Sequence, residues 1–488
     1  MKRTGRIASG PVSFLVAPLA LAAVVFASVT GCKPAPVPEN IASPVRETDP
    51  CLVKAGSTID DDDPIVIAVM GEVDPGRAPV ASNDAERVLF GMLYEPLIRL
   101  DCEGNVRACG ASEWSVSKDS TEWLFTLPPA GWLDGRGVIA RNWIEAWQHA
   151  RGIPGAPASL RDLTENAREA GLTTLRIEWP GEPRDLIRAL AEPAASLTKR
   201  GKQVRSRAEM PMGTGPWALD PGPATYPGDF LLARNGFTRT VGSEETPLMN
   251  VPVLVKTGNI EHAGRGRKER REIELIRDEH DVVFVRDASA WKLGERGGYG
   301  IVESSGDEVL VIASRNEDLL SLGRSLTEKD ATLESALPVR TRAWTGAGSG
   351  KATRQKSSRS SSKRVDERVV YPAWRADARA LAERLVARAR EDERFANLKA
   401  AGLPGANDWY GSLEAGEAKA YVIPVRIPDS ASGDLAKTMD LVLPWGGHWT
   451  ALAGVRSAVV VHPSIRNFAF DIDGYPRFDR VGRAGDMR

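Results

Sequence analysis

Cysteine and histidine are the residues of this sequence best suited to redox chemistry or metal binding. Cys102 and Cys109 close the segment CEGNVRAC, whose Gly-Asn turn suits a disulfide in an exported protein. Cys51 would then be left over. Zinc binding is the poorer interpretation, because the chain has no second close cysteine pair and its five histidines show no H-x-x-x-H spacing. We therefore expect a Cys102–Cys109 disulfide, no metal and no cofactor.

Motifs of the common enzyme classes do not occur in the sequence. There is no G-x-S-x-G, H-E-x-x-H or C-x-x-C, and no G-x-G-x-x-G follows an expected strand. The segment GSGK fails as a phosphate-binding loop, because Thr345 stands where the first glycine is required and Ala352 stands where serine or threonine would bind magnesium. The sequence thus favours a protein that is not an enzyme.

The N-terminal segment has the composition of an export signal. Basic residues precede an apolar run from about Val12 to Val29, which is alanine-rich and too short for a stable transmembrane helix. The run ends in VTGC, which resembles the bacterial lipobox and would make Cys32 the lipidated first residue. An ordinary signal peptide with a chance cysteine is the alternative. We expect residues 1–31 to be removed and the mature chain to be anchored to a membrane by lipid.

Two polar segments are predicted to be flexible. Residues 32–64 are rich in proline and aspartate and predict a flexible tether, with the folded part beginning at Ile65. Residues 346–364 are basic and low in complexity, which indicates an exposed loop; contact with an anionic surface is the alternative. The net charge of −1 gives no reason to expect nucleic acid as a partner.

Strands and helices alternate along the rest of the chain without an internal repeat. Apolar residues recur at helical spacing at Ile139, Trp143 and Trp147, and again at Leu381, Leu385, Ala389 and Phe395. β-branched content and alternation predict strands at 65–70, 123–127, 175–179, 281–285, 308–313, 420–427 and 457–462. The order predicts an α/β fold.

Local signals between residues 73 and 151 come in a distinctive order. The segments VDP, LYEPLIRLDCEGNV, ASEWSVSKDSTEWLFTL and GWLDGRGVIARNWIEAWQHAR follow one another. This order resembles the extracytoplasmic solute-binding proteins of family 5, which serve peptide, dipeptide and nickel import. PMGTGPWAL and RNFAFDIDGYPRFDRVGR, farther along, are also similar to family segments. The matching positions of the first region are Tyr94, Glu95, Leu97, Asp101, Gly104, Ala111, Trp114, Asp119, Phe125, Leu127, Asp134, Gly135, Ala140, Trp147 and Arg151.

The chain departs from the family where ligand is bound. The expected segment that supplies a carboxylate for the α-amine of a peptide is PVRIPDSASGD here, with Asp429 the nearest candidate. Arg426 lies close enough in sequence to neutralise Asp429, and a turn after Pro428 is the alternative role. The resemblance places Trp409, Trp445 and Trp449 near the cleft, and core packing is the alternative for each of these three.

The resemblance implies an α/β fold of the periplasmic-binding-protein type, class II, with two hinged lobes and a small inserted lobe. Residues 65–488 would form the solute-binding domain. The expected boundaries are 52–92, 189–262 and 458–488 for lobe I, 93–188 for lobe II and 263–457 for lobe III.

The resemblance also implies a function. We expect a monomeric, lipid-anchored receptor on the extracytoplasmic face of the cell envelope. It would capture a peptide-like solute between its lobes and deliver it to the permease subunits of an ABC importer. A degenerate relative with a sensory or structural role and no transport is the alternative, and a surface hydrolase is a third, weaker interpretation.

Overall fold

The structure, a computed structural model, describes most of the chain from Cys51 onward. The signal segment, Cys32 and Asp429 lie outside the described residues, so the predictions made for them stay predictions. No described helix is long and apolar enough to cross a bilayer. The described residues are 51–59, 62–199, 210–220, 228–236, 251–257, 260–263, 266–269, 272–278, 280–286, 288–303, 308–328, 341–342, 349–352, 366–403, 406–426, 435, 439, 442–443, 445–455, 457–471 and 473–484.

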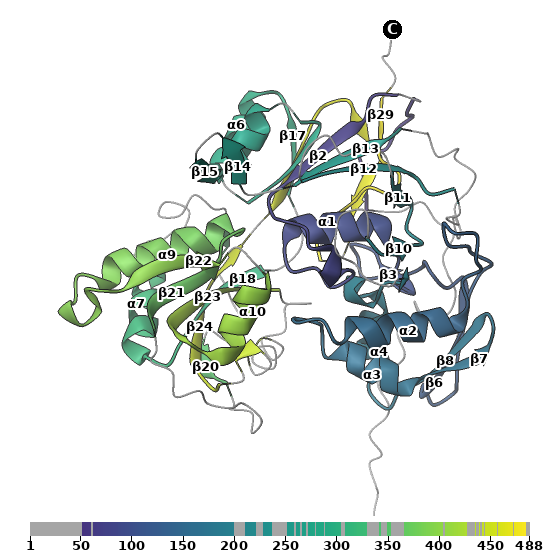
Figure 1. The fold of residues 1–488 in the computed structure, drawn as a ribbon, viewed down its shortest axis with the longest axis horizontal. Helices are drawn as coiled ribbons and strands as arrows, with labels where there is room; N and C mark the ends of the chain where they lie inside the picture. The colour runs from purple at the N-terminus through teal and green to yellow at the C-terminus, as the bar shows by residue number, and fades with distance from the viewer. Residues whose placement is uncertain are drawn as a thin grey trace, which may run out of the picture. The chain divides into compact units, whose positions relative to one another are not determined.

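One seven-stranded mixed sheet contains the first predicted strand at its centre (Figure 1). Strand β2 runs parallel to both β13 and β16, whereas β25 runs antiparallel between β16 and β17. The central strands read as continuous apolar runs because both faces of the sheet are covered. The strand order is β11 (Trp217–Leu219), β12 (Asp229–Arg234), β13 (Val253–Thr257), β2 (Ile65–Val69), β16 (Val282–Val285), β25 (Ala458–Val461) and β17 (Gly300–Glu303).

Alternate residues of β16 show the two covered faces. Val282 and Phe284 pack with helix α1 (Asp84–Leu93), whereas Val283 and Val285 pack against α5 (Glu272–Arg277) and α6 (Ala288–Arg296). The side chain of Asn83 caps α1 by accepting a hydrogen bond from the Glu86 amide. Hydrogen bonds place β16 and β17 in the same sheet as β2. The expected boundaries instead assign residues 263–457, which include both strands, to lobe III. The lobe boundaries stay a prediction.

A second mixed sheet has helices on both faces. Helices α7 (Glu317–Glu328) and α9 (Ala376–Ala389) pack on one face, and α10 (Ala406–Ala415) packs on the other (Figure 1). Strand β20 (Ser349–Lys351) pairs with β24, so this part of the predicted exposed loop is strand. The order is β19 (Thr341–Arg342), β24 (His448–Val455), β18 (Glu308–Ser314), β23 (Ala418–Arg426), β21 (Asp366–Pro372) and β22 (Lys399–Leu403).

A four-stranded antiparallel sheet forms a third packing unit. It consists of β5 (Glu113–Val116), β6 (Glu122–Thr126), β8 (Thr174–Glu178) and β7 (Ala167–Gly171). Helices α2 (Ala140–Ala150), α3 (Ser159–Asn166) and α4 (Pro183–Ala191) share its core, and Figure 1 shows them beside β6, β7 and β8. Trp143 and Trp147 are both buried there, with ring centroids 6.1 Å apart.

The predicted elements are confirmed. The seven predicted strands are β2, β6, β8, β16, β18, β23 and β25, whose ends agree with prediction within two residues. The predicted helical faces lie on α2 and α9, although Ile139 is the N-cap of α2 and Phe395 belongs to a short 3-10 turn after α9. The α/β class is thus correct.

Short strands and turns complete the described structure. The remaining pairs are β1 (Leu52–Val53) with β27 (Phe468–Phe470), β27 with β28 (Pro476–Arg477), β3 (Ile98–Leu100) with β4 (Val106–Ala108), β9 (Thr198–Lys199) with β10 (Met212–Gly213), β14 (Ile260–Ala263) with β15 (Gly266–Glu269) and β26 (Ile465–Arg466) with β29 (Gly482–Arg483). The 3-10 turns are Pro75–Arg77, Pro193–Ala195 and Glu393–Phe395.

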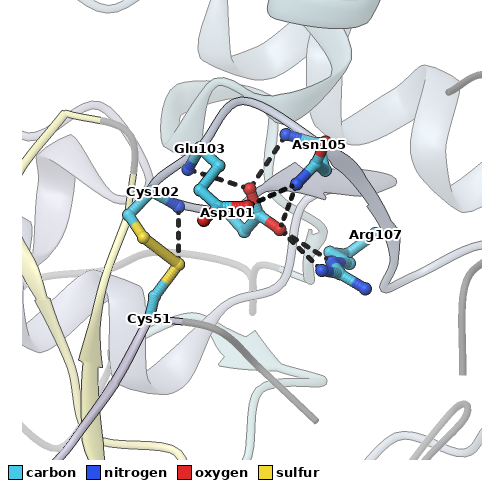
Figure 2. The surroundings of a disulfide bond; sticks show 6 residues. All are labelled: Cys51, Asp101, Cys102, Glu103, Asn105 and Arg107. Atoms are coloured by element: carbon cyan, nitrogen blue, oxygen red, sulfur yellow. Dashed lines mark hydrogen bonds and ion pairs between the residues drawn. A yellow bond between two sulfur atoms is a disulfide. The ribbon is translucent and has the colours of Figure 1, made fainter. Parts of the chain in front are cut away.

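The predicted Cys102–Cys109 disulfide is wrong, because Cys102 is bonded to Cys51 (Figure 2). Cys102 lies in the turn of the β3–β4 hairpin, whereas Cys109 follows β4 at the opposite end. The two cysteines are thus separated by about five residues of strand, roughly 17 Å. Such a separation exceeds the reach of a disulfide, and the Cys109 thiol is free.

Asp101 holds Cys102 in position for this bond. Its carboxylate accepts hydrogen bonds from the backbone amides of Glu103 at 3.0 Å and Asn105 at 2.9 Å, and from Arg107 Nε at 2.9 Å (Figure 2). Burial acts to raise the pKa of Asp101, but these donors hold the pKa below its ordinary value. Gly104 has a φ of +83°, a conformation that favours glycine in this turn.

The disulfide also corrects the predicted start of the folded part. Leu52 and Val53 pair with β27, and the Ile59 amide donates a hydrogen bond to the carbonyl of Arg483 at 3.0 Å. The prediction that folding begins at Ile65 is therefore wrong. The attachment of residues 51–59 to the folded part could not be predicted from composition. Strand β1 is too short to show a periodic pattern, and the disulfide partner of Cys51 is 51 residues away.

We expect reduction of this disulfide to destabilise the protein. The bond closes a 51-residue separation, and removing such a constraint costs about 2–4 kcal/mol. Urea unfolding of Cys51→Ser should show this loss and no further effect of dithiothreitol. Cys109→Ser is the matched control and should keep the sensitivity of the unaltered protein to reductant. Equal sensitivity of all three proteins would contradict the pairing.

Candidate functional site

A cavity of about 410 Å³ lies where the three packing units meet. Residues at the start of α1 line one side, the loop before α3 and the segment after α4 line another, and residues of the second sheet with α10 line the third. The volume falls within the range of about 300–1,000 Å³ that is common for small-molecule sites. We call this cavity the cleft.

Aromatic side chains form much of the apolar surface of the cleft. Trp374, Trp409, Tyr410 and Tyr475 all line it. Tyr410 also packs closely on Gly155, where an added Cβ would lie 2.9 Å from the ring and the φ of +81° favours glycine. Flat rings of this kind offer a large contact area to a bound solute.

Arg286 organises a buried ion network behind the cleft. The side chain is 1% exposed, and its guanidinium lies 2.8 and 2.9 Å from the two carboxylate oxygens of Asp84 and 2.5 Å from Glu308 Oε2. The Tyr475 hydroxyl donates to Asp84 at 2.6 Å. Burial acts against the charged form of both partners, yet their mutual attraction lowers the pKa of Asp84 and raises that of Arg286. Asp84 and Arg286 therefore stay charged.

Arg375 extends this network to the cleft surface. Its Nη2 lies 3.0 Å from Glu308 Oε2, and its Nε lies 2.9 Å from Asp377 Oδ1. Glu308 thus lies between two guanidinium groups, from Arg286 and Arg375. Since Glu308 begins β18 and Asp84 begins α1, the network ties the first sheet to the second.

Arg87 forms a second group of ion pairs at the cleft. It contacts Asp473 at 2.6 Å, Asp471 at 3.4 Å and Glu192 at 3.5 Å, and its guanidinium lies 5.2 Å from the centroid of the Tyr475 ring. The side chain of Glu192 is 37% exposed. One guanidinium thus faces three carboxylates.

No group of three or more histidine, cysteine or acidic side chains is arranged to hold a metal ion within the described part of the chain. The acidic residues of the cleft are instead engaged with Arg87, Arg286 and Arg375.

The structure separates the three tryptophans that the sequence predicts near the cleft. Trp409 lines the cavity. Trp445 and Trp449 are 8% and 2% exposed and pack in the same apolar cluster, but neither is among the residues that line the cavity. The Nε1 of Trp445 donates to the carbonyl of Leu413 at 2.8 Å. Core packing, the stated alternative, therefore describes Trp445 and Trp449.

Sequence reasoning missed most of the charged residues at the cleft. Asp84, Arg87, Glu192, Arg286 and Arg375 belong to no motif, and their partners are distant in the chain. Trp374 could have been found by the argument that selected the other tryptophans, because it is also a tryptophan within the expected lobe III.

We expect Arg286→Met to destabilise the protein by about 3–5 kcal/mol, because Asp84 and Glu308 would lose their buried counter-charge. Urea unfolding followed by circular dichroism measures the loss. Arg394→Gln is the matched control: Arg394 also pairs with two carboxylates, those of Asp318 and Asp392, but it is 64% exposed and should matter far less. Similar losses in the two variants would contradict the importance of the buried network.

No protein-family model matches the sequence, and no curated protein matches it. Solved structures do resemble it in fold. The Escherichia coli murein tripeptide binding protein MppA has a TM-score of 0.64 at 12% identity, covering 88% of this chain and 100% of MppA. Haemophilus influenzae OppA in complex with RPPGFSPFR has a TM-score of 0.62 at 10% identity, covering 87% of this chain and 100% of OppA.

Brucella suis NikA in complex with Fe(III)-EDTA is also similar, with a TM-score of 0.54 at 14% identity, covering 86% of this chain and 100% of NikA. These similarities extend over most of the chain and over the whole of each compared protein. The protein therefore has the lobed α/β fold of class II periplasmic binding proteins, as its sequence predicts.

Proposed function

We propose that the chain belongs to solute-binding family 5 and acts as the binding protein of an ABC importer, capturing a small peptide-like solute in the cleft. The observation that carries the proposal is the cleft itself, an aromatic-lined cavity of about 410 Å³ at the meeting point of three packing units. MppA and OppA, which share the fold, are described as binding a murein tripeptide and a peptide, respectively.

The proposed mechanism is binding without covalent chemistry. Closure of a hinged protein is favoured when a ligand contacts both sides of the cleft at once. Trp409 and Tyr410 on α10 and Ser82 and Asn83 before α1 lie on different sides of this cavity. A solute that contacts both sets would stabilise the closed state. The volume favours a small solute over a long peptide.

Charge at the cleft favours a ligand that carries an ammonium group. Glu192 and Asp473 both line the cavity beside Arg87, and Glu192 is partly open to solvent. Their carboxylates accept hydrogen bonds only, so an ammonium group is a suitable partner. We assign to Glu192 the amine-anchoring role for which the sequence offered Asp429. Trp374 and Trp409 would pack on the apolar part of the ligand.

Lipidation at Cys32 belongs to the same proposal. A lipid anchor followed by the proline-rich segment would keep the receptor near the permease subunits and raise its effective concentration there. The protein would work as a monomer on the extracytoplasmic face of the cell envelope.

We expect a random tripeptide mixture to cause a saturable change in tryptophan fluorescence, because Trp374 and Trp409 line the cleft. Trp409→Phe should reduce this change. Trp445→Phe is the matched control, since Trp445 lies in the same apolar cluster away from the cleft. The absence of any saturable change with unaltered protein would contradict peptide binding and favour a relative without transport. Release of new amines would indicate hydrolysis.

We expect Glu192→Gln to weaken binding of peptides with a free α-amine by about tenfold, because a hydrogen bond between charged groups would become weaker. Isothermal titration calorimetry with a peptide and its N-acetylated form measures the effect. The acetylated peptide should bind both proteins equally. An equal loss for the two peptides would show that Glu192 does not contact the amine.

A further inference from the structure

A second cavity, of about 200 Å³, lies next to the cleft. It is bounded by the C-terminal half of α1, the β3–β4 hairpin, the start of β11 and the C-terminal segment around Phe478. Arg87, Asp473 and Tyr475 line both cavities and form their common wall. A liquid water molecule occupies about 30 Å³, so the space accommodates about seven waters or a small organic molecule.

Arginine side chains dominate the charge of this second cavity. Arg99, Arg234, Arg477 and Arg480 line it together with Asp479. Arg99 Nη1 lies 3.1 Å from Asp479 Oδ2, and Arg234 donates to the backbone carbonyl of Asp479. Burial acts to raise the pKa of Asp479, but Arg477 and Arg99 hold it well below its ordinary value. The carboxylate of Asp479 thus pairs with Arg99 and Arg477, while Arg234 and Arg480 line the same cavity.

The other acidic residues of the cavity do not balance this excess. Burial raises the pKa of Glu95 to about 8, so most of this carboxyl group is protonated at neutral pH. Asp471 and Asp473 pair with Arg87. Burial lowers the pKa of Arg234 to about 10, against the attraction of Asp479. Five arginines line the cavity against the carboxylates of Asp471, Asp473 and Asp479 and a largely neutral Glu95, so an added anion would be stabilised here.

The rest of the wall is apolar. Met92, Leu100, Pro216 and Phe478 line the cavity, and the ring of Trp217 lies below Arg234, with 3.9 Å between the guanidinium carbon and the ring centroid. A ligand that satisfies both surfaces needs one anionic group for the arginines and a small apolar body for these side chains.

We propose that this second cavity binds a small organic anion, a carboxylate attached to a compact apolar or aromatic body, at a site separate from the cleft. Arg234 and Arg99 contact the carboxylate, and Met92, Leu100 and Phe478 contact the apolar body. Binding at this site does not require the ligand of the cleft to be a peptide.

Ligand-observed fluorine NMR with para-fluorophenylacetate tests the proposal. We expect saturable binding, and binding at least about tenfold weaker for the neutral para-fluorophenylacetamide and for Arg234→Gln. Gly91→Phe should abolish binding by filling the cavity, since a Cβ at Gly91 meets nothing within 4 Å. Gly91→Ala is the matched control and should bind normally. Circular dichroism confirms that each variant is folded.

Three further outcomes would overturn the proposal. If the amide binds as well as the acid, the site does not select an anion. If Gly91→Phe binds the probe like Gly91→Ala, the cavity is not the site. Displacement of the probe by the tripeptide mixture would place the anion in the cleft. Lack of peptide binding alone would contradict the proposed transport role and leave this site unaffected, so the two failures are distinguishable.

Discussion

The structure at the cleft depends on the buried charge of Arg286. Its guanidinium bridges Asp84 at the start of α1 and Glu308 at the start of β18, and its backbone amide donates to Glu272 at 2.6 Å. Removing such a charge from water is unfavourable, and only a nearly complete set of partners offsets the loss of hydration. The network is therefore cooperative, because removal of one member leaves the others buried without compensation. It fixes where the two large sheets approach each other.

The side chains at the cleft differ in whether they support the structure or are suited to contact a ligand. Asp84 and Glu308 face the cavity, but each is already held by a guanidinium group, so they are better suited to support than to ligand exchange. Trp409 and Tyr410 present aromatic rings to the cavity, and Glu192 is partly exposed to solvent. A rigid charged floor with an aromatic and acidic rim would suit a receptor that binds and releases its solute without chemical change.

Sequence reasoning found the elements better than it found the contacts between them. Strands such as IVIAV and AVVV consist of apolar residues that are typical of buried strands, so they could be predicted from the local sequence. The Cys51–Cys102 bond and the Asp84–Arg286 pair join residues 51 and 202 positions apart, and nothing in local composition specifies such partners. Trp409, Trp445 and Trp449 show the same limit, because tryptophan suits a core as well as a ligand site, and only the fold separates them.

Arg87 links the cleft to the second cavity. It belongs to the wall between them, where Asp473 and Tyr475 also face both spaces. On the cleft side it faces Glu192 and Asp473, whereas the second cavity adds Arg99 and Arg234 to it beside Asp471 and Asp473. The two cavities should therefore prefer ligands of opposite sign, a cation in the cleft and an anion behind it. Because one guanidinium serves both environments, occupation of either cavity would strengthen the electrostatic attraction for the complementary charge in the other.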